Sequence, residues 1–261
     1  MHLTGLDLLL WALSLAAHIV LLAVLVIRHR AHVFPIFTTW ITANILRTVT
    51  LYFTLHYGSK DNYFYTYWTL AIVDVALQIA VAYELASHVF RPLGAWARDV
   101  RSSFLALIGV SVLIAALLTW LATPTTRTLR LALVIRGNFF SSALVSELFV
   151  AMIALSVTMG LPWRTHVARL AQGLGVYSIF GVLTEAAHSY FGTDRGNQMY
   201  KLLSHIRIEL YLVCVSYWII TVSLKEPEPR KLPEHLHQEL RELQRRAAMV
   251  LHNIRVMGTP S

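Results

Sequence analysis

Seven stretches of about 20 or more mostly apolar residues follow one another along this chain of 261 residues, and they restrict its fold more than any other feature. A helix rises about 1.5 Å per residue, so each stretch is long enough to cross a hydrocarbon layer of roughly 30 Å. Inside lipid every backbone N–H and C=O needs a partner within the protein, and a helix supplies it locally. The predicted helical spans cover about residues 6–27, 33–57, 64–89, 103–122, 131–157, 168–191 and 202–224.

Composition supports the same class. Only 14% of the residues are charged and the mean hydropathy is +0.57, whereas an ordinary soluble domain carries about a quarter charged residues. The first apolar stretch is longer than the core of a signal peptide, so we interpret it as a retained span. The sequence therefore predicts an all-α polytopic membrane protein, with a bundle of seven transmembrane helices over residues 1–224 and a tail over residues 225–261.

The basic residues predict an orientation. Fourteen lysines and arginines lie in the tail and after the first, third and fifth spans, against five in the other connections. Because cytoplasmic segments carry the excess of basic residues, we expect the N-terminus outside and the tail in the cytoplasm, with lipid as the main partner. The net charge of +8 is explained by this asymmetry, and no nucleic-acid partner is predicted because the basic residues do not gather on one folded face.

The tail changes character after Pro227 and Pro229. Within residues 233–257 apolar residues recur at alternating spacings of four and three, which is typical of an amphipathic helix. The repeated positions are Leu236, Leu240, Leu243, Ala247, Val250, Ile254 and Met257. Two interpretations stay open: the helix lies on the membrane surface, or it pairs with a second copy or with another protein.

Charged residues inside the predicted spans are the main functional lead. The acids are Asp74, Glu84, Glu147, Glu185 and Glu209, and the arginines are Arg47, Arg136 and Arg207. A charge at the centre of a bilayer costs at least ~2.5 kcal/mol, so these side chains are expected to turn inward and find partners. The acids outnumber the arginines by two, so the negative charge is in excess. Three explanations stay open: some carboxyl groups are neutral, Glu84 reaches water, or a cation binds.

Most of these residues are predicted to lie at one level. Successive spans run in opposite directions, which brings the polar positions into the outer half of the bundle, and Gln78 shares a helical face with Asp74 four residues earlier. Arg136 and Glu147 are about 16 Å apart along one helix, so Arg136 needs an acid from another helix. The predicted ligand pocket for a small molecule consists of Arg47, Asp74, Gln78, Arg136, Glu147, Glu185 and Glu209.

Two histidines suggest an alternative chemistry. Glu185 and His188 are three residues apart, His205 and Glu209 are four apart, and both pairs are predicted at similar depth. Two carboxylates and two imidazoles are a ligand set for a divalent metal, although pairing with the arginines explains the same residues. No other cofactor is predicted, and we interpret His18 as a hydrogen-bonded core histidine instead of a haem ligand.

Three short strings carry a resemblance. Phe34–Phe37 and Tyr65–Trp68 open two of the predicted spans, and Tyr83–Glu84 stands near the end of one. These strings resemble a group of predicted bacterial seven-span membrane proteins, and the likeness covers roughly residues 5–224. The resemblance implies the fold and a bacterial inner membrane as the location, and no particular activity. The topology is also similar to the heptahelical sensor regions of bacterial signalling proteins, although no kinase or cyclase domain follows the seventh span here.

Three hypotheses follow for the function. The favoured one is a heptahelical sensor or binding module, in which the outer pocket takes a small molecule or a proton and the tail contacts a cytoplasmic partner. The second is a membrane enzyme that depends on a metal held by Glu185, His188, His205 and Glu209. The third is a structural subunit of a larger membrane complex, in which the charges only pair with each other. The sequence predicts no catalytic residue.

Overall fold

Every described element of the computed structural model is an α-helix, which confirms the all-α prediction. The structure describes residues 5–90, 98–122, 129–158, 166–191 and 198–224. The helices are α1 (Gly5–Ile27), α2 (Pro35–Tyr57), α3 (Lys60–Phe90), α4 (Arg98–Leu121), α5 (Leu129–Thr158), α6 (His166–Phe191) and α7 (Gln198–Ser223). The chain divides into two compact units, Met1–Lys225 and Glu226–Ser261. The helix predicted at 233–257 belongs to the second unit and lies outside the described residues.

Six of the seven described helices are long and apolar enough to cross a membrane, namely α1 and α3 to α7. By helix length and composition the chain is therefore a multi-pass membrane protein. The exception is α2, which has 23 residues but carries Arg47 and six threonines. Several of these threonine hydroxyls donate to the backbone oxygen four residues earlier in the same helix, which reduces the polarity that α2 presents to its surroundings.

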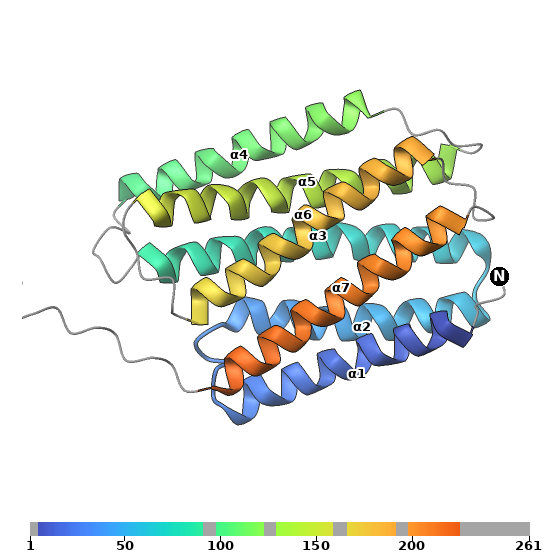
Figure 1. The fold of residues 1–261 in the computed structure, drawn as a ribbon, viewed down its shortest axis with the longest axis horizontal. Coiled ribbons are helices and arrows are strands. Elements are labelled where there is room, and N and C mark those ends of the chain that lie inside the picture. The colour runs from blue at the N-terminus through green and yellow to red at the C-terminus, as the bar shows by residue number, and fades with distance from the viewer. Residues whose placement is uncertain (1–4, 91–97, 123–128, 159–165, 192–197, 225–261) are drawn as a thin grey trace, which may run out of the picture. The chain divides into compact units, whose positions relative to one another are not determined.

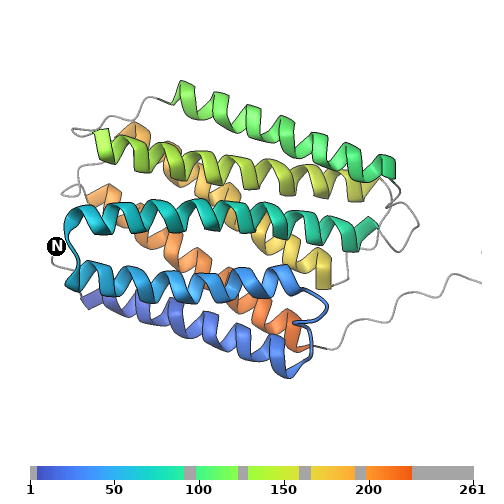
Figure 2. The same ribbon diagram turned by 180° about the vertical axis from the view of Figure 1, so that it is seen from behind.

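Within the first unit, five helices lie side by side in the order α4, α5, α3, α2 and α1, and α6 and α7 cross one side of this row (Figures 1 and 2). α6 packs against α5 and α3, while α7 packs against α6 and α1. The first and last described helices are therefore neighbours. Polar residues on α1, α2, α3, α6 and α7 can approach one another in the space between the row and the two crossing helices.

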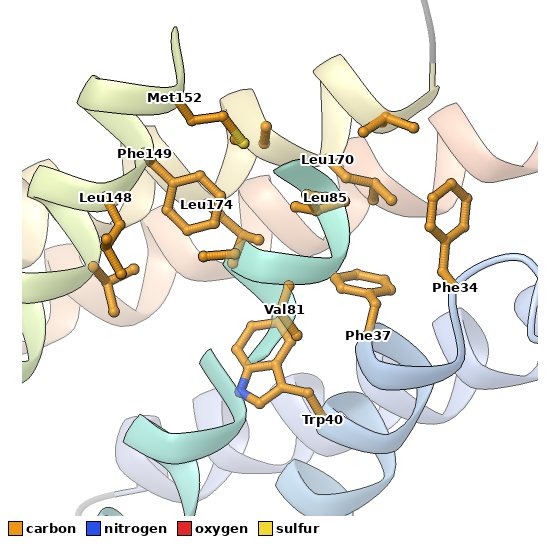
Figure 3. Packing of buried hydrophobic residues seen from close by; sticks show 14 of the residues in the cluster. Phe34, Phe37, Trp40, Val81, Leu85, Leu148, Phe149, Met152, Leu170 and Leu174 are labelled. Atoms are coloured by element: carbon orange, nitrogen blue, oxygen red, sulfur yellow. The ribbon is translucent and has the colours of Figure 1, made fainter. Parts of the chain in front are cut away.

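A continuous apolar core fills one half of the bundle, which we call the packed half. It contains the C-terminal parts of α1, α3, α5 and α7 and the N-terminal parts of α2 and α6. Figure 3 shows side chains of this core meeting between the helices. The large residues with at most 1% exposure in this half include Leu25, Phe37, Leu85, Leu148, Phe149, Leu170 and Trp218.

Trp218 of α7 shows how closely the packed half is filled. Its ring meets Phe37 at 5.7 Å and Trp40 at 6.0 Å between centroids, both edge to face. A Cβ atom added at Gly173 of α6 would lie 2.2 Å from the indole Nε1 of Trp218. Glycine at this position therefore lets α6 approach this indole closely.

Candidate ligand-binding site

Three cavities occupy the other half of the bundle, which we call the polar half. It contains the N-terminal parts of α1, α3, α5 and α7 and the C-terminal parts of α2 and α6. The cavity volumes are about 400, 380 and 250 Å³, and Tyr177 of α6 lines all three. We call the cavity of about 400 Å³ the main cavity. Arg47, Asp74 and Gln78 line both this cavity and the one of about 250 Å³, and Arg207 lines both this cavity and the one of about 380 Å³. The cavities thus converge on one group of polar side chains.

Asp74 of α3 is held by three donors. Trp40 Nε1 donates to Oδ1 over 2.9 Å, and Gln78 Nε2 donates to Oδ2 over 2.8 Å. Arg47 Nη1 of α2 donates to the same Oδ2 over 3.0 Å, and its guanidinium lies 6.0 Å from the centroid of the Tyr67 ring. Charge-assisted bonds of this kind link α2 to α3 and fix the carboxylate at the cavity wall.

Glu185 of α6 is the second anchored acid. It is only 2% exposed and forms an ion pair with Arg207 Nη1 of α7. The His188 Nδ1 atom lies 3.6 Å from the other carboxylate oxygen of Glu185. Arg207 also lines the main cavity, with a quarter of its side chain exposed. This pair joins α6 to α7 in the same half in which Arg47 joins α2 to α3.

His18 of α1 has partners on both ring nitrogens. Nδ1 lies 2.7 Å from the backbone oxygen of Ser14, and Nε2 lies 2.6 Å from the hydroxyl oxygen of Tyr211. The Tyr211 ring in turn meets the Tyr177 ring at 4.8 Å between centroids. The interpretation of His18 as a hydrogen-bonded core histidine is confirmed.

The four predicted metal ligands are not brought together. Glu185 and His188 are neighbours, but His205 Nε2 lies 2.8 Å from Oδ1 of Asp7 at the start of α1. Glu209 has an exposed side chain. Within the parts of the chain that the structure describes, no group of three or more His, Cys, Asp and Glu residues is placed to hold a metal ion. The residues thus form separate polar contacts, and the geometry gives no support to the metal-dependent enzyme.

Glu209 is also absent from the lining of the three cavities, in which we had placed it. The physical reason is helical geometry. Residues two apart in a helix point roughly 200° apart, so Glu209 and Arg207 cannot both face the bundle interior. The structure turns Arg207 inward, where it finds Glu185, and turns Glu209 outward.

Arg136 and Glu147 of α5 are likewise missing from the lining of these cavities. The Nε atom of Arg136 and the Oε2 atom of Glu147 are buried and have no hydrogen-bond partner among the described residues. The acid that we expected opposite Arg136 is not found in this part of the chain. Of the seven predicted pocket residues, Arg47, Asp74 and Gln78 line the cavities, and Glu185 supports the wall through Arg207.

Glu84 serves the fold and not the site. Its carboxylate accepts the backbone N–H groups of Ile36 over 2.9 Å and Phe37 over 2.8 Å, at the first turn of α2. The first N–H groups of a helix lack partners within it, and a negative charge there is favourable. α2 starts at Pro35, and Phe34 before it provides no side-chain cap. The lack of a capping residue at this start could have indicated that the first N–H groups need an acceptor from another helix. The explanation that Glu84 reaches water is wrong, because its side chain is buried.

No protein-family model matches the chain, and comparisons with curated proteins and with solved structures gave no match either. The functional interpretation therefore depends on the chemistry of the chain's own residues. The strongest feature in the described part is the polar half, where cavities and anchored charges coincide.

Proposed function

We propose that this protein is a seven-span membrane sensor or binding module, which takes a small molecule into its polar half and reports it through its tail. The observation that supports this is the convergence of three cavities on Arg47, Asp74, Gln78, Tyr177 and Arg207. The main cavity, at about 400 Å³, falls within the range of roughly 300–1,000 Å³ that is usual for ligand pockets. A molecule in it would contact five helices at once.

The seven-span topology requires α2 to cross the bilayer. With 23 residues it is about 34 Å long, which is sufficient. Its polar groups have partners inside the protein: Arg47 pairs with Asp74, and threonine hydroxyls bond to the helix backbone. The excess of basic residues in the tail and in the connections on its side supports a cytoplasmic tail, and the resemblance supports a bacterial inner membrane. In this orientation the polar half faces outward.

Binding would act through the two ion pairs. Arg47 connects α2 to α3, and Arg207 connects α7 to α6. A ligand shifts an equilibrium only when it contacts two states differently, and a ligand that bonds to either arginine competes with these connections between helices. Because α7 leads directly into the tail, movement of α7 is the route by which binding reaches a cytoplasmic partner.

Capture from native membranes tests the binding function. The full chain is purified with its own lipids, and the small molecules that remain bound are identified by mass spectrometry. Ala71→Phe fills the main cavity, while Ala116→Phe is the matched control on the exposed face of α4. We expect one or more molecules in the wild type and the control that are lost from Ala71→Phe. The same set in all three proteins would contradict the proposal.

Deletion of residues 233–261 tests the signalling part. We expect the shortened chain to insert, fold and capture the same small molecules, while a cytoplasmic protein that crosslinks to the full chain is lost. An unchanged set of crosslinked proteins would contradict a role of the tail in partner contact, whatever the result of the capture experiment.

A further inference from the structure

The lining of the main cavity carries information about what it binds. This inference rests on the proposed binding function and extends it to the chemical class of the ligand. Much of the wall is apolar, with Ala71, Ile72 and Val75 of α3 facing Val134 and Phe140 of α5. The polar side chains gather among these apolar groups. A molecule that fits must therefore be amphipathic.

The two arginines of the wall have hydrogen-bond donors to spare. A guanidinium group has five N–H groups, and the bonds of Arg47 to Asp74 and of Arg207 to Glu185 each use only part of them. Trp68 adds an aromatic surface: its ring lines the cavity, while its Nε1 atom is buried and not reached from the cavity. A ligand oxygen in the cavity can accept from the remaining N–H groups of the two arginines without displacing their carboxylates.

Trp68 is held in place by its neighbour on α5. A Cβ atom added at Gly137 would lie 2.7 Å from Cη2 of Trp68, so only glycine allows the ring to rest against this helix. Next to Gly137, the Asn138 Oδ1 atom accepts the hydroxyl of Tyr67 over 2.9 Å. These contacts position the wall before any ligand arrives, which favours binding because less ordering is required.

The strong acceptors, in contrast, are already engaged. Asp74 accepts from Trp40, Arg47 and Gln78, and Glu185 faces Arg207 and His188. A cationic ligand would have to displace one of these donors from its carboxylate. An ammonium group would therefore find no carboxylate ready to receive it.

The charges of this wall are balanced. Arg47 is matched by Asp74 and Arg207 by Glu185, and among the described residues no other charged side chain lines the main cavity. A net charge brought into such a site would remain uncompensated in a medium of low dielectric constant, which is unfavourable for either sign. An uncharged ligand avoids this cost and still uses the free donors.

We propose that the main cavity binds an uncharged amphipathic molecule whose carbonyl oxygen accepts hydrogen bonds from Arg47 and Arg207. The apolar part of the molecule lies against the alanine, valine and isoleucine side chains of α3. Ligands that carry a carboxylate or an ammonium on the same carbon skeleton bind more weakly.

Three probes of one skeleton test this inference: 4-phenylbutanamide, 4-phenylbutanoate and 4-phenylbutylamine. Binding to the full chain in lipid nanodiscs is measured by equilibrium dialysis, with empty nanodiscs as the blank for partition into lipid. We expect the amide to bind at least about tenfold more tightly than either charged probe, since an uncompensated buried charge opposes binding. Ala71→Phe should abolish this binding and Ala116→Phe should preserve it.

The outcomes separate the ligand class from the binding function. Tightest binding by the carboxylate or the amine, lost in Ala71→Phe, would overturn the uncharged class and leave the cavity as a binding site. If none of the three probes shows binding that is lost in Ala71→Phe, the inference is overturned. The capture experiment from native membranes then decides the binding function independently, because it makes no assumption about the ligand.

Discussion

The two halves of the bundle use carboxylates differently, and α3 carries one of each kind: Glu84 is buried and Asp74 is half-buried. Glu84 lies in the packed half and accepts two backbone N–H groups of α2, surrounded by a filled apolar core. Asp74, ten residues earlier and so about 15 Å away along the helix, accepts three side-chain donors beside two cavities. A buried acid in a membrane helix therefore does not by itself indicate a binding site. What distinguishes the site is the unfilled space next to the anchored charge.

The largest expected effect on the free energy of unfolding comes from removing the Glu84 carboxylate. Glu84→Ala should lower the free energy of unfolding by about 3–5 kcal/mol, because two backbone donors are left buried without an acceptor in a filled core. Asp74→Ala should cost less, about 1–2 kcal/mol, because water can enter the adjacent cavities and solvate its former donors. Reversible unfolding in mixed micelles measures both, with Glu84→Gln as a control that keeps one acceptor. An equal or larger loss at Asp74 would break the comparison.

The Glu185–Arg207 pair tests how much a buried ion pair in the polar half contributes to the free energy of unfolding, compared with Glu84 in the packed half. Glu185→Leu should cost about 2–4 kcal/mol, since Arg207 loses its counter-ion while a quarter of its side chain remains exposed. The double variant Glu185→Leu/Arg207→Leu should recover most of this loss. Additive losses in the double variant would show that the two side chains do not depend on each other.

One substitution made twice on α3 compares the space in the two halves. Ala86 is fully buried in the packed half, so Ala86→Phe should cost about 1–3 kcal/mol through overpacking. Ala71 lines the main cavity, so Ala71→Phe should change the free energy of unfolding by less than about 0.5 kcal/mol. Similar losses at both positions would mean that the polar half is as full as the packed half.

The smallest effect is expected at Glu209. Its side chain is exposed on a membrane helix, so Glu209→Leu should leave the stability in a lipid bilayer unchanged or raise it by up to about 1 kcal/mol. Ligand capture should also be unaffected, in contrast to any variant that fills the main cavity. A clear loss of stability in this variant would show that Glu209 has an interior partner after all.

The length and order of the helices could be predicted from the sequence because apolar stretches of about 20 residues have few other solutions. The predicted spans 6–27 and 168–191 differ by one or two residues from Gly5–Ile27 and His166–Phe191. The largest differences arise where polar residues extend a helix beyond its apolar core. Thus α3 begins at Lys60, four residues before the predicted span, and α4 begins at Arg98.

The candidate site could be predicted only in part, because the sequence does not determine the rotation of each helix. Asp74 and Gln78 were recognised as sharing a face, and the structure places both beside Arg47. Arg207 and Glu209 were both inside the predicted span, and nothing in the local pattern indicated which of them faces inward. Tyr177 was missed for a related reason: a tyrosine among apolar residues has no spacing that marks it as part of a cavity wall.

The most direct test of the account compares two engineered cysteines on α3. Cys214 is the only native cysteine, so a Cys214→Ala background allows Ala71→Cys and Ala86→Cys to be labelled one at a time. A water-soluble methanethiosulfonate reacts with the thiolate, which forms where water reaches the side chain. The account predicts that the cysteine at position 71 reacts at least about a hundredfold faster than the one at position 86. Equal rates, or faster labelling at position 86, would contradict the division into a polar, accessible half and a packed half.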